Sequence, residues 1–301
     1  LTPVFRDGLF LANAAGRFTA GTLIAGVEQL METLVGWTRP YQFDPHAVEV
    51  GFGLKDSRLP GWRLDLGGDH ALVLRGRIDR VDLCRVAADA ALVVIVDYKS
   101  SARELDAVKL HHGLELQLLA YLGALSQLPD PKGEFGVARL LPAGVFYVSL
   151  KGGAKGGDNR VEAQDDPQTL RTEGYQHRGR FDGGQLERFD NRGVAKGDQF
   201  RFSKNKDGEF SKRGNEALPA EAFGALLKQV EDFLRRYGQA IYAGDARVAP
   251  YRKGTETACD FCDYRPICRF DPWTEPYRVL RPPSKPSDAA PAGKTSARKK
   301  P

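Results

Sequence analysis

The pattern of apolar and polar positions predicts alternating helices and strands along most of the chain. Apolar side chains recur at helical spacing over residues 18–36 and again over residues 217–242, which predicts two amphipathic helices. Residues 47–53 have the character of a strand. The unbroken apolar run at residues 91–96 is typical of a strand that is buried on both faces.

Further segments complete the predicted order of elements. Residues 71–83 are strand-like with a glycine in their middle, residues 113–122 have helical character, and residues 144–150 form another apolar strand. The resulting order, helix, three strands, helix and strand, predicts an α/β fold with a mixed sheet flanked by helices. Residues 151–215 are rich in glycine and polar residues, and we expect an insertion of variable structure there.

Acidic residues stand where the two central strands can bring them together. Asp79 lies in the phrase Gly-Arg-Ile-Asp, and Asp97 begins the phrase Asp-Tyr-Lys at the end of the apolar run. The polar turn near residue 88 allows a hairpin that places Asp79 beside Asp97, so that two carboxylates could bind one Mg²⁺ or Mn²⁺. Lys99 shares a face with Asp97 because side chains alternate along a strand, and an ammonium there can offset charge on a phosphate. Asp82 is interpreted as a solvated charge at a strand end.

Two other polar positions are candidates for the same site. Gln117 and Tyr121 are four residues apart on the predicted helix, so they share a face and both can donate hydrogen bonds to phosphate. Glu49, in the phrase Val-Glu-Val-Gly-Phe-Gly, is either a charge on the face of a strand or part of the metal site.

These phrases in this order resemble the PD-(D/E)xK nucleases, and within them the RecB-like branch. The closest likeness is to the nuclease domain of AddB-type subunits of bacterial ATP-dependent helicase–nucleases, over about residues 40–275. The resemblance implies a restriction-endonuclease-like core. It implies that Asp79 and Asp97 bind Mg²⁺ (or Mn²⁺), which activates a water, and that Lys99 orients this water.

The resemblance also implies a biological setting. Gln117 and Tyr121 would hold the DNA backbone without regard to sequence, and the module would act as an exonuclease. Its partner would be an ATP-dependent helicase subunit of the AddA type, in the repair of double-strand breaks by homologous recombination. An acidic residue also occurs at the position of Glu49 in this family.

Three closely spaced cysteines, Cys259, Cys262 and Cys268, favour a metal or cluster over disulfides in an intracellular-looking chain. Zinc needs four ligands, and the five histidines show no spacing that would supply the fourth. In the resembled family this cysteine pattern holds a 4Fe–4S cluster, with a fourth cysteine upstream of the nuclease motifs. Cys84 is interpreted instead as a buried structural thiol. Because the chain begins at Leu1, we expect a fragment that lacks both the upstream cysteine and a metal-binding histidine.

Composition adds limits rather than a function. No apolar stretch approaches 18 residues, so neither a membrane span nor a signal peptide is expected, and we expect a cytoplasmic protein. The net charge of +5 comes from residues 281–301, which hold six basic residues and one acidic residue. The remainder is formally neutral, so the basic pI is poor evidence for DNA binding.

We expect three parts: a helical lead-in at residues 1–40, a nuclease domain at residues 41–275 and a disordered basic tail at residues 276–301. Three alternatives stay open. The first is a Cas4-type or free-standing RecB-like exonuclease, which the long polar insertion argues against. The second is a non-catalytic DNA-binding scaffold of the same fold, against which all three expected catalytic residues are present. The third is a zinc-stabilised structural domain.

Overall fold

The computed structural model describes residues 8, 10–151, 172–211 and 214–283. The chain forms two compact units. The first comprises Leu1–Leu105 and Glu115–Asp245, and the second comprises Asp106–Leu114 and Ala246–Pro301. Among the described residues, no helix combines the length and the apolar character that a membrane span requires.

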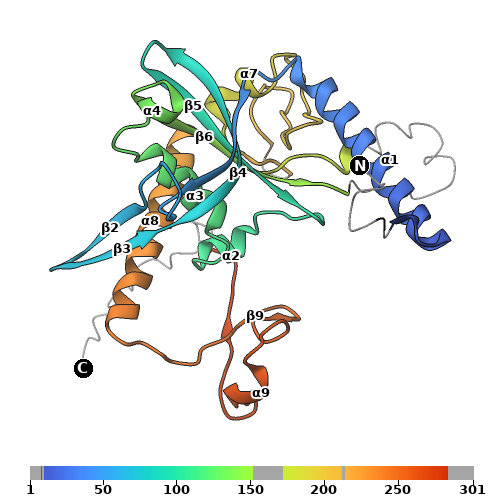
Figure 1. Cartoon of the computed structure of the whole chain (residues 1–301). Coiled ribbons are helices and arrows are strands. Elements are labelled where there is room, and N and C mark those ends of the chain that lie inside the picture. The colour runs from blue at the N-terminus through green and yellow to red at the C-terminus, as the bar shows by residue number, and fades with distance from the viewer. Residues whose placement is uncertain (1–7, 9, 152–171, 212–213, 284–301) are drawn as a thin grey trace, which may run out of the picture. The chain divides into compact units, whose positions relative to one another are not determined.

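A six-stranded sheet organises the first unit, with the strand order β1-β4-β5-β6-β7-β8 (Figure 1). Its strands are β1 (Asp44–Phe52), β4 (Gly76–Ala87), β5 (Ala90–Lys99), β6 (Arg139–Ser149), β7 (Arg178–Asp182) and β8 (Ala217–Leu218). The pairs β5–β6 and β7–β8 are parallel, and the other three pairs are antiparallel. The sheet is therefore mixed, as expected.

Strand β5 is buried from Ala90 to Asp97, because it lies in the middle of the sheet and both of its faces are covered. Helix α3 (Gln117–Ser126) packs on β5 and β6. An aromatic cluster that includes Phe146, Phe181 and Phe200 packs with Val94 and Val96 of β5. This burial accounts for the unbroken apolar run in the sequence.

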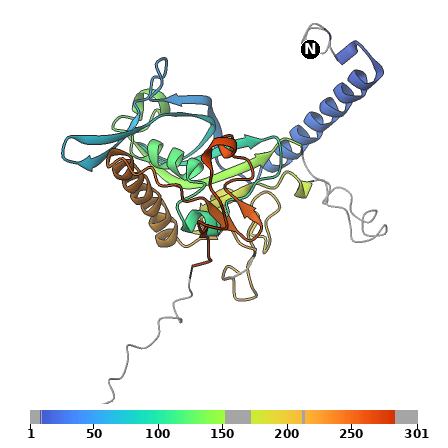
Figure 2. The ribbon, with the colours of Figure 1, turned by 90° about the horizontal axis from the view of Figure 1, so that it is seen from below.

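The predicted segment at residues 71–83 is two strands rather than one. Its first part belongs to β3 (His70–Leu74), which pairs with β2 (Trp62–Gly67) in a separate two-stranded sheet. Its second part belongs to β4 of the large sheet. The long helix α8 (Ala220–Tyr242), predicted at residues 217–242, contacts the β2–β3 hairpin and runs beside α3 (Figure 2).

Helix α1 (Ala14–Thr38) confirms the predicted amphipathic helix, but most of its apolar face is exposed. Leu23, Ile24, Val27 and Met31 each leave about half of their surface open, whereas Leu30 is buried. In Figure 2 the N-terminal part of α1 extends away from the sheet. The contacts that hold it come from near its C-terminal end, where Leu30 and Trp37 pack with Tyr175.

The polar insertion expected at residues 151–215 is only partly described, because residues 152–171 lie outside the described residues. Its described part contains β7, a 3₁₀ turn (Gly183–Gln185) and the short helix α7 (Leu186–Phe189). Since β7 pairs with β6, this part of the insertion belongs to the central sheet. Four-residue α4 (Lys132–Phe135) precedes β6.

The second unit holds a three-stranded sheet in the order β10-β9-β11, with β9 (Tyr251–Lys253), β10 (Glu256–Thr257) and β11 (Arg278–Val279). Its helices are α2 (Ala107–His111) and α9 (Arg265–Cys268). Ion pairs from Lys109 to Glu256, at 2.7 Å, and from Asp106 to Lys253 join α2 to this sheet. Strand β11 lies in the expected disordered tail, so the tail is ordered there; residues 284–301 lie outside the described residues.

A buried histidine in the core makes the stability of the first unit depend on pH. His177 is 2% exposed, among the rings of Trp37, Phe146 and Phe200, and this burial lowers its pKa from 6.5 to about 3. The unfolded chain therefore binds a proton between pH 6.5 and 3 that the folded chain does not bind. We expect the free energy of unfolding to fall as the pH is lowered through this window, by up to about 1.4 kcal/mol per pH unit from this residue.

The variant His177→Phe provides the comparison, because it keeps an aromatic ring but cannot titrate. We expect urea unfolding at a series of pH values to give the variant a shallower loss of stability below pH 6.5 than the wild type. Equal slopes in the two proteins would show that His177 does not contribute this pH dependence.

Candidate functional site

The two predicted metal-binding carboxylates lie opposite each other on neighbouring strands. The antiparallel register of β4 and β5 pairs Val81 with Ile95 and Arg80 with Val96, and Asp79 and Asp97 are the residues next to this last pair on the two strands. The Asp79 carboxylate accepts a hydrogen bond from the Tyr98 backbone N–H at 2.8 Å. The hairpin therefore brings Asp79 and Asp97 together, as the sequence predicts.

Asp97 is a buried carboxylate whose neighbour is a lysine. Its exposed fraction is 4%, and Lys99 Nζ lies 2.5 Å from its Oδ2. Among the described residues this oxygen has no hydrogen-bond partner of acceptable geometry. The Lys99 side chain is 26% exposed, so it reaches both Asp97 and solvent. The Lys99 ammonium beside this oxygen offsets the cost of burying the carboxylate charge.

The donor chemistry fits Mg²⁺ or Mn²⁺. Both ions prefer oxygen ligands, and Mg²⁺ in particular is often held by one or two carboxylates together with waters and substrate phosphates. Asp79 and Asp97 supply two such carboxylates. No group of three His, Cys, Asp or Glu side chains in the described part of the chain is arranged to hold a metal ion. Water and substrate phosphate are common further ligands of these ions.

Tyr147 and Arg103 border the pair, and no motif in the sequence points to either of them as a site residue. Tyr147 is paired with Asp97 across β5 and β6, and both Lys99 Nζ and the Arg103 guanidinium lie over its ring, at 5.6 and 5.3 Å from the ring centre. Burial raises the pKa of Tyr147 to about 12, so its hydroxyl is protonated at neutral pH. Tyr147 reaches the site because β6 pairs with β5 in parallel register, and the sequence does not show this register.

The predicted phosphate contacts are joined to each other. Gln117 Nε2 donates to the Tyr121 hydroxyl at 2.9 Å, one helical turn along α3. The Tyr121 ring meets Phe52 edge-on at 5.7 Å between centres. A Cβ atom at Gly76 would come within 2.9 Å of the Tyr121 ring, so the glycine in the Gly-Arg-Ile-Asp phrase makes room for this ring.

Glu49 lies on β1, between the pairs that join β1 to β4 on either side of Asp79. Its backbone has φ of 51°, an uncommon conformation for a residue other than glycine. Its carboxylate is 3.4 Å from Arg77 Nη1, and both side chains are more than half exposed. This surface ion pair favours the interpretation of Glu49 as a charge on the face of a strand.

The interpretation of Asp82 as a solvated charge is wrong. Asp82 is fully buried and its two carboxylate oxygens accept hydrogen bonds from Arg80 at 2.6 and 2.7 Å and from the Tyr41 hydroxyl at 2.9 Å. Arg80 also donates to the Tyr98 hydroxyl at 3.0 Å. Since side chains alternate along β4, Asp82 points to the face opposite Asp79 and belongs to the core.

The cysteine segment is a run of tight turns in the second unit. The carboxylate of Asp260 accepts hydrogen bonds from the backbone N–H and the hydroxyl of Thr257, at 2.7 and 2.8 Å. All three thiols are free, with Cys259 and Cys262 half-buried and Cys268 exposed. Three thiolates are an incomplete set for a four-cysteine cluster, and within the described ranges no trio of ligating side chains is gathered for a metal.

The fourth cysteine does not belong to this segment. Cys84 is buried in the aromatic core of the first unit, and Arg188 Nη1 lies 3.6 Å from its sulfur. This placement agrees with a structural thiol.

The chain is similar to one family of known proteins along most of its length. The model of the "PD-(D/E)XK nuclease superfamily" matches residues 7–269. A protein from Symbiobacterium thermophilum, named as the B-type subunit of an ATP-dependent helicase/deoxyribonuclease, is 33% identical over 284 residues, which cover 93% of this chain and 24% of that protein. Proteins of the same name from Moorella thermoacetica and Desulfitobacterium hafniense are 34% and 32% identical, over 90% and 89% of this chain.

The chain thus spans about a quarter of the length of these curated relatives. The family model covers far more than half of the chain, including the strands that carry Asp79, Asp97 and Lys99. With the mixed sheet and the paired carboxylates in place, the chain belongs to the PD-(D/E)XK nuclease superfamily.

Proposed function

We propose that this chain is a metal-dependent deoxyribonuclease module that hydrolyses phosphodiester bonds at the ends of β4 and β5. The observation that carries the proposal is the buried carboxylate of Asp97, with the Lys99 ammonium 2.5 Å from its Oδ2 and with the Asp79 carboxylate hydrogen-bonded to the N–H of the next residue, Tyr98.

Each residue of the site has a chemical task in this proposal. Asp79 and Asp97 would hold Mg²⁺, and the ion supplies an activated water and neutralises charge on the scissile phosphate. Lys99, on the same strand face as Asp97, places its ammonium where it can orient the attacking water and stabilise charge on the phosphorus centre. The Asp79 carboxylate is oriented by the Tyr98 N–H.

Gln117 and Tyr121 on α3 would bind the backbone of the substrate strand. We expect Tyr121→Phe to raise KM for DNA by about 3- to 10-fold with a smaller effect on kcat, because a hydroxyl contact to phosphate is worth on the order of 1 kcal/mol. The ring contacts with Phe52 and Gly76 are kept in this variant, so thermal unfolding should be unchanged. Steady-state kinetics on labelled single-stranded DNA measure both constants. A KM equal to that of the wild type would remove Tyr121 from the substrate contacts.

The likeness to helicase/deoxyribonuclease subunits supports a wider proposal. In the longer protein, we propose, the module is an exonuclease that works with an ATP-dependent helicase subunit of the AddA type in double-strand break repair. The second unit would hold a 4Fe–4S cluster through Cys259, Cys262, Cys268 and a fourth thiolate. In support, Phe261 and Trp273 there are 96% exposed, and so little apolar burial suits a unit stabilised by a bound centre. Iron and sulfide per chain test this, and zinc in their place would contradict it.

The nuclease proposal is tested by incubating the purified chain with end-labelled single-stranded DNA, in Mg²⁺ and in EDTA. We expect cleavage that requires Mg²⁺, is lost in Asp97→Asn and is kept in Asp69→Asn, a matched change at an exposed aspartate in the β2–β3 turn. Cleavage that survives in EDTA or in Asp97→Asn would contradict the assigned site. No cleavage by any of the three proteins would leave two alternatives, a non-catalytic DNA-binding scaffold or a site that lacks the expected metal-binding histidine, and the same assay on a chain extended upstream would decide between them.

A further inference from the structure

A pocket of about 460 Å³ opens in the first unit, beside the end of β7, in the region that the sequence presents as a polar insertion. Its wall carries three cationic side chains, Arg178, Lys196 and Arg201, one carboxylate, Glu173, and the hydrogen-bonding side chains of Gln176 and Ser203. We call it the arginine pocket. Lys196 is exposed and forms no ion pair within the described part of the chain.

One wall residue of the arginine pocket, Arg178, projects to the same sheet face as Asp97. Asp97 of β5 is paired with Tyr147 of β6, and Tyr147 is paired with Arg178 of β7. Residues paired directly across neighbouring strands project to one face, so Asp97, Tyr147 and Arg178 form a row. Strands are about 4.8 Å apart, which puts the Arg178 backbone about 10 Å from that of Asp97.

Arg178 is held in place by a buried carboxylate. Its Nε donates to Glu216 at 2.9 Å, and Glu216 also accepts the Gly179 N–H at 2.6 Å. The Glu216 side chain is 6% exposed, so this anchor is inside the protein. A guanidinium fixed on one edge presents its other edge at a defined position.

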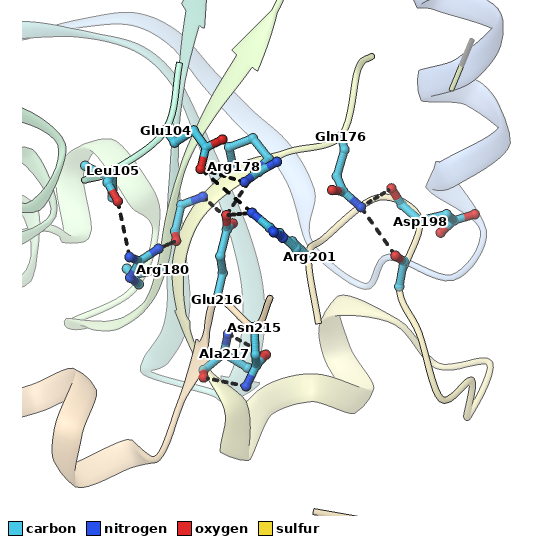
Figure 3. A network of polar contacts seen from close by, with 12 residues as sticks. Glu104, Leu105, Gln176, Arg178, Arg180, Asp198, Arg201, Asn215, Glu216 and Ala217 are labelled. Carbon is cyan, nitrogen blue, oxygen red and sulfur yellow. Dashed lines mark hydrogen bonds and ion pairs between the residues drawn. The ribbon is translucent and has the colours of Figure 1, made fainter. Parts of the chain in front are cut away.

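The other edge of Arg178 meets an exposed carboxylate. Glu104 accepts from Arg178 Nη2 at 2.8 Å and lies 3.7 Å from Arg201 Nη1, and its side chain is 63% exposed (Figure 3). The Arg201 side chain donates no hydrogen bond among the described residues; its two carboxylate neighbours, Glu104 and Glu216, are 3.7 and 4.0 Å away. Glu104 thus bridges two guanidinium groups from the solvent side, and Arg201 has donors to spare.

We infer that the arginine pocket binds a backbone phosphate of the DNA strand that is cut at Asp79 and Asp97, and that Glu104 occupies the phosphate position until DNA displaces it. This inference rests on the proposed nuclease function. A backbone phosphodiester carries one negative charge, as the Glu104 carboxylate does, and its two non-bridging oxygens can accept from two guanidinium groups at once.

The test measures DNA binding by the purified chain in EDTA, with fluorescence anisotropy of a short labelled oligo(dT). We expect Arg201→Gln to weaken binding at least ~3-fold and to reduce the slope of log K against log salt by ~0.7, the value for one phosphate contact on a single strand. We expect Glu104→Gln to strengthen binding by about 2- to 5-fold, because it removes a negative charge that competes with phosphate for Arg178 and Arg201. The effect is modest because exposed ion pairs are weak. The two changes lie in one cluster and act in opposite directions.

Two controls separate the effect of the arginine pocket from misfolding and from the loss of one positive charge elsewhere on the protein. Arg63→Gln, at an exposed arginine on β2, makes the same change of charge outside the arginine pocket, and we expect it to leave the affinity unchanged. Arg201 is a better target than Arg178 because it holds no buried hydrogen bond, and thermal unfolding confirms that each variant is folded. Equal losses in Arg201→Gln and Arg63→Gln, or weaker binding by Glu104→Gln, would overturn the inference, as would a wild-type chain that does not bind.

The two proposals fail separately. Because binding is measured in EDTA, it does not require cleavage. An active nuclease in which Arg201→Gln binds like the wild type would refute the arginine pocket alone. An inactive wild-type chain that still binds DNA through Arg201 would refute the nuclease chemistry and leave the pocket as a DNA-binding site.

Discussion

Replacing Asp97 by asparagine is expected to lower the rate of Mg²⁺-dependent DNA cleavage by ~10³-fold or more while the protein stays folded. A metal ion stabilises such a transition state by several kcal/mol, and each 1.36 kcal/mol changes the rate tenfold. Loss of this stabilisation gives the expected fall in rate. Asparagine keeps the shape of the side chain but offers the metal a neutral amide in place of a charged oxygen. Only the charge is therefore tested.

The fold should survive this change for a structural reason. Asparagine gives up the ion pair between Oδ2 and Lys99 Nζ, but the Lys99 side chain is 26% exposed and can turn to water. We expect the free energy of unfolding to stay within about 1 kcal/mol of the wild type. Single-turnover cleavage rates and thermal unfolding, measured on the same preparation, give both quantities. A folded Asp97→Asn protein with the wild-type rate would show that the chemistry lies elsewhere.

The paired carboxylates could be predicted because every step toward them is local. The apolar run ending at Asp97 marks a central strand, the turn near residue 88 permits a hairpin, and the hairpin sets Asp79 opposite Asp97. Likewise the spacing of Gln117 and Tyr121 on α3 requires only the period of a helix. A sequence shows such relations because the partners are close along the chain or on one element.

The relations that were missed join distant parts of the chain. The anchor between Arg178 and Glu216 spans 38 residues, and the pairing of Tyr147 with Asp97 depends on a parallel crossover. Strand β7 is short and carries charged residues and a glycine, so periodicity did not separate it from the polar insertion. It belongs to the sheet because it pairs with β6 and β8, and the composition of the segment does not show this pairing.

The same distinction explains Asp82, which the sequence indicates as a solvated charge at a strand end. Its partner Arg80 is only two residues away and so shares its face, and this was a usable signal. What the sequence did not show is that this face is covered, since the Tyr41 ring that closes over it comes from 41 residues upstream. The burial, and with it the energetic weight of the pair, depends on tertiary packing.

The buried pair of Asp82 and Arg80 gives the second large expected effect, which is a loss of stability. We expect Asp82→Ala to lower the free energy of unfolding by about 3–5 kcal/mol, because it leaves the guanidinium of Arg80 largely buried without its carboxylate. The Tyr41 hydroxyl loses its acceptor in the same change. Chemical unfolding followed by circular dichroism measures the loss.

The matched control is Asp89→Ala, at the turn of the same β4–β5 hairpin. Asp89 forms an ion pair with Arg139 at 3.4 Å, but both side chains are more than half exposed. Exposed pairs contribute about 0–1 kcal/mol, so this variant should be close to the wild type. If the two variants were destabilised equally, the hairpin turn rather than burial of the Asp82–Arg80 pair would be the source of the effect. A large difference between them would place the stability of the hairpin in the face opposite the paired carboxylates, so that the charge of Asp97 can be changed without unfolding the strands that carry it.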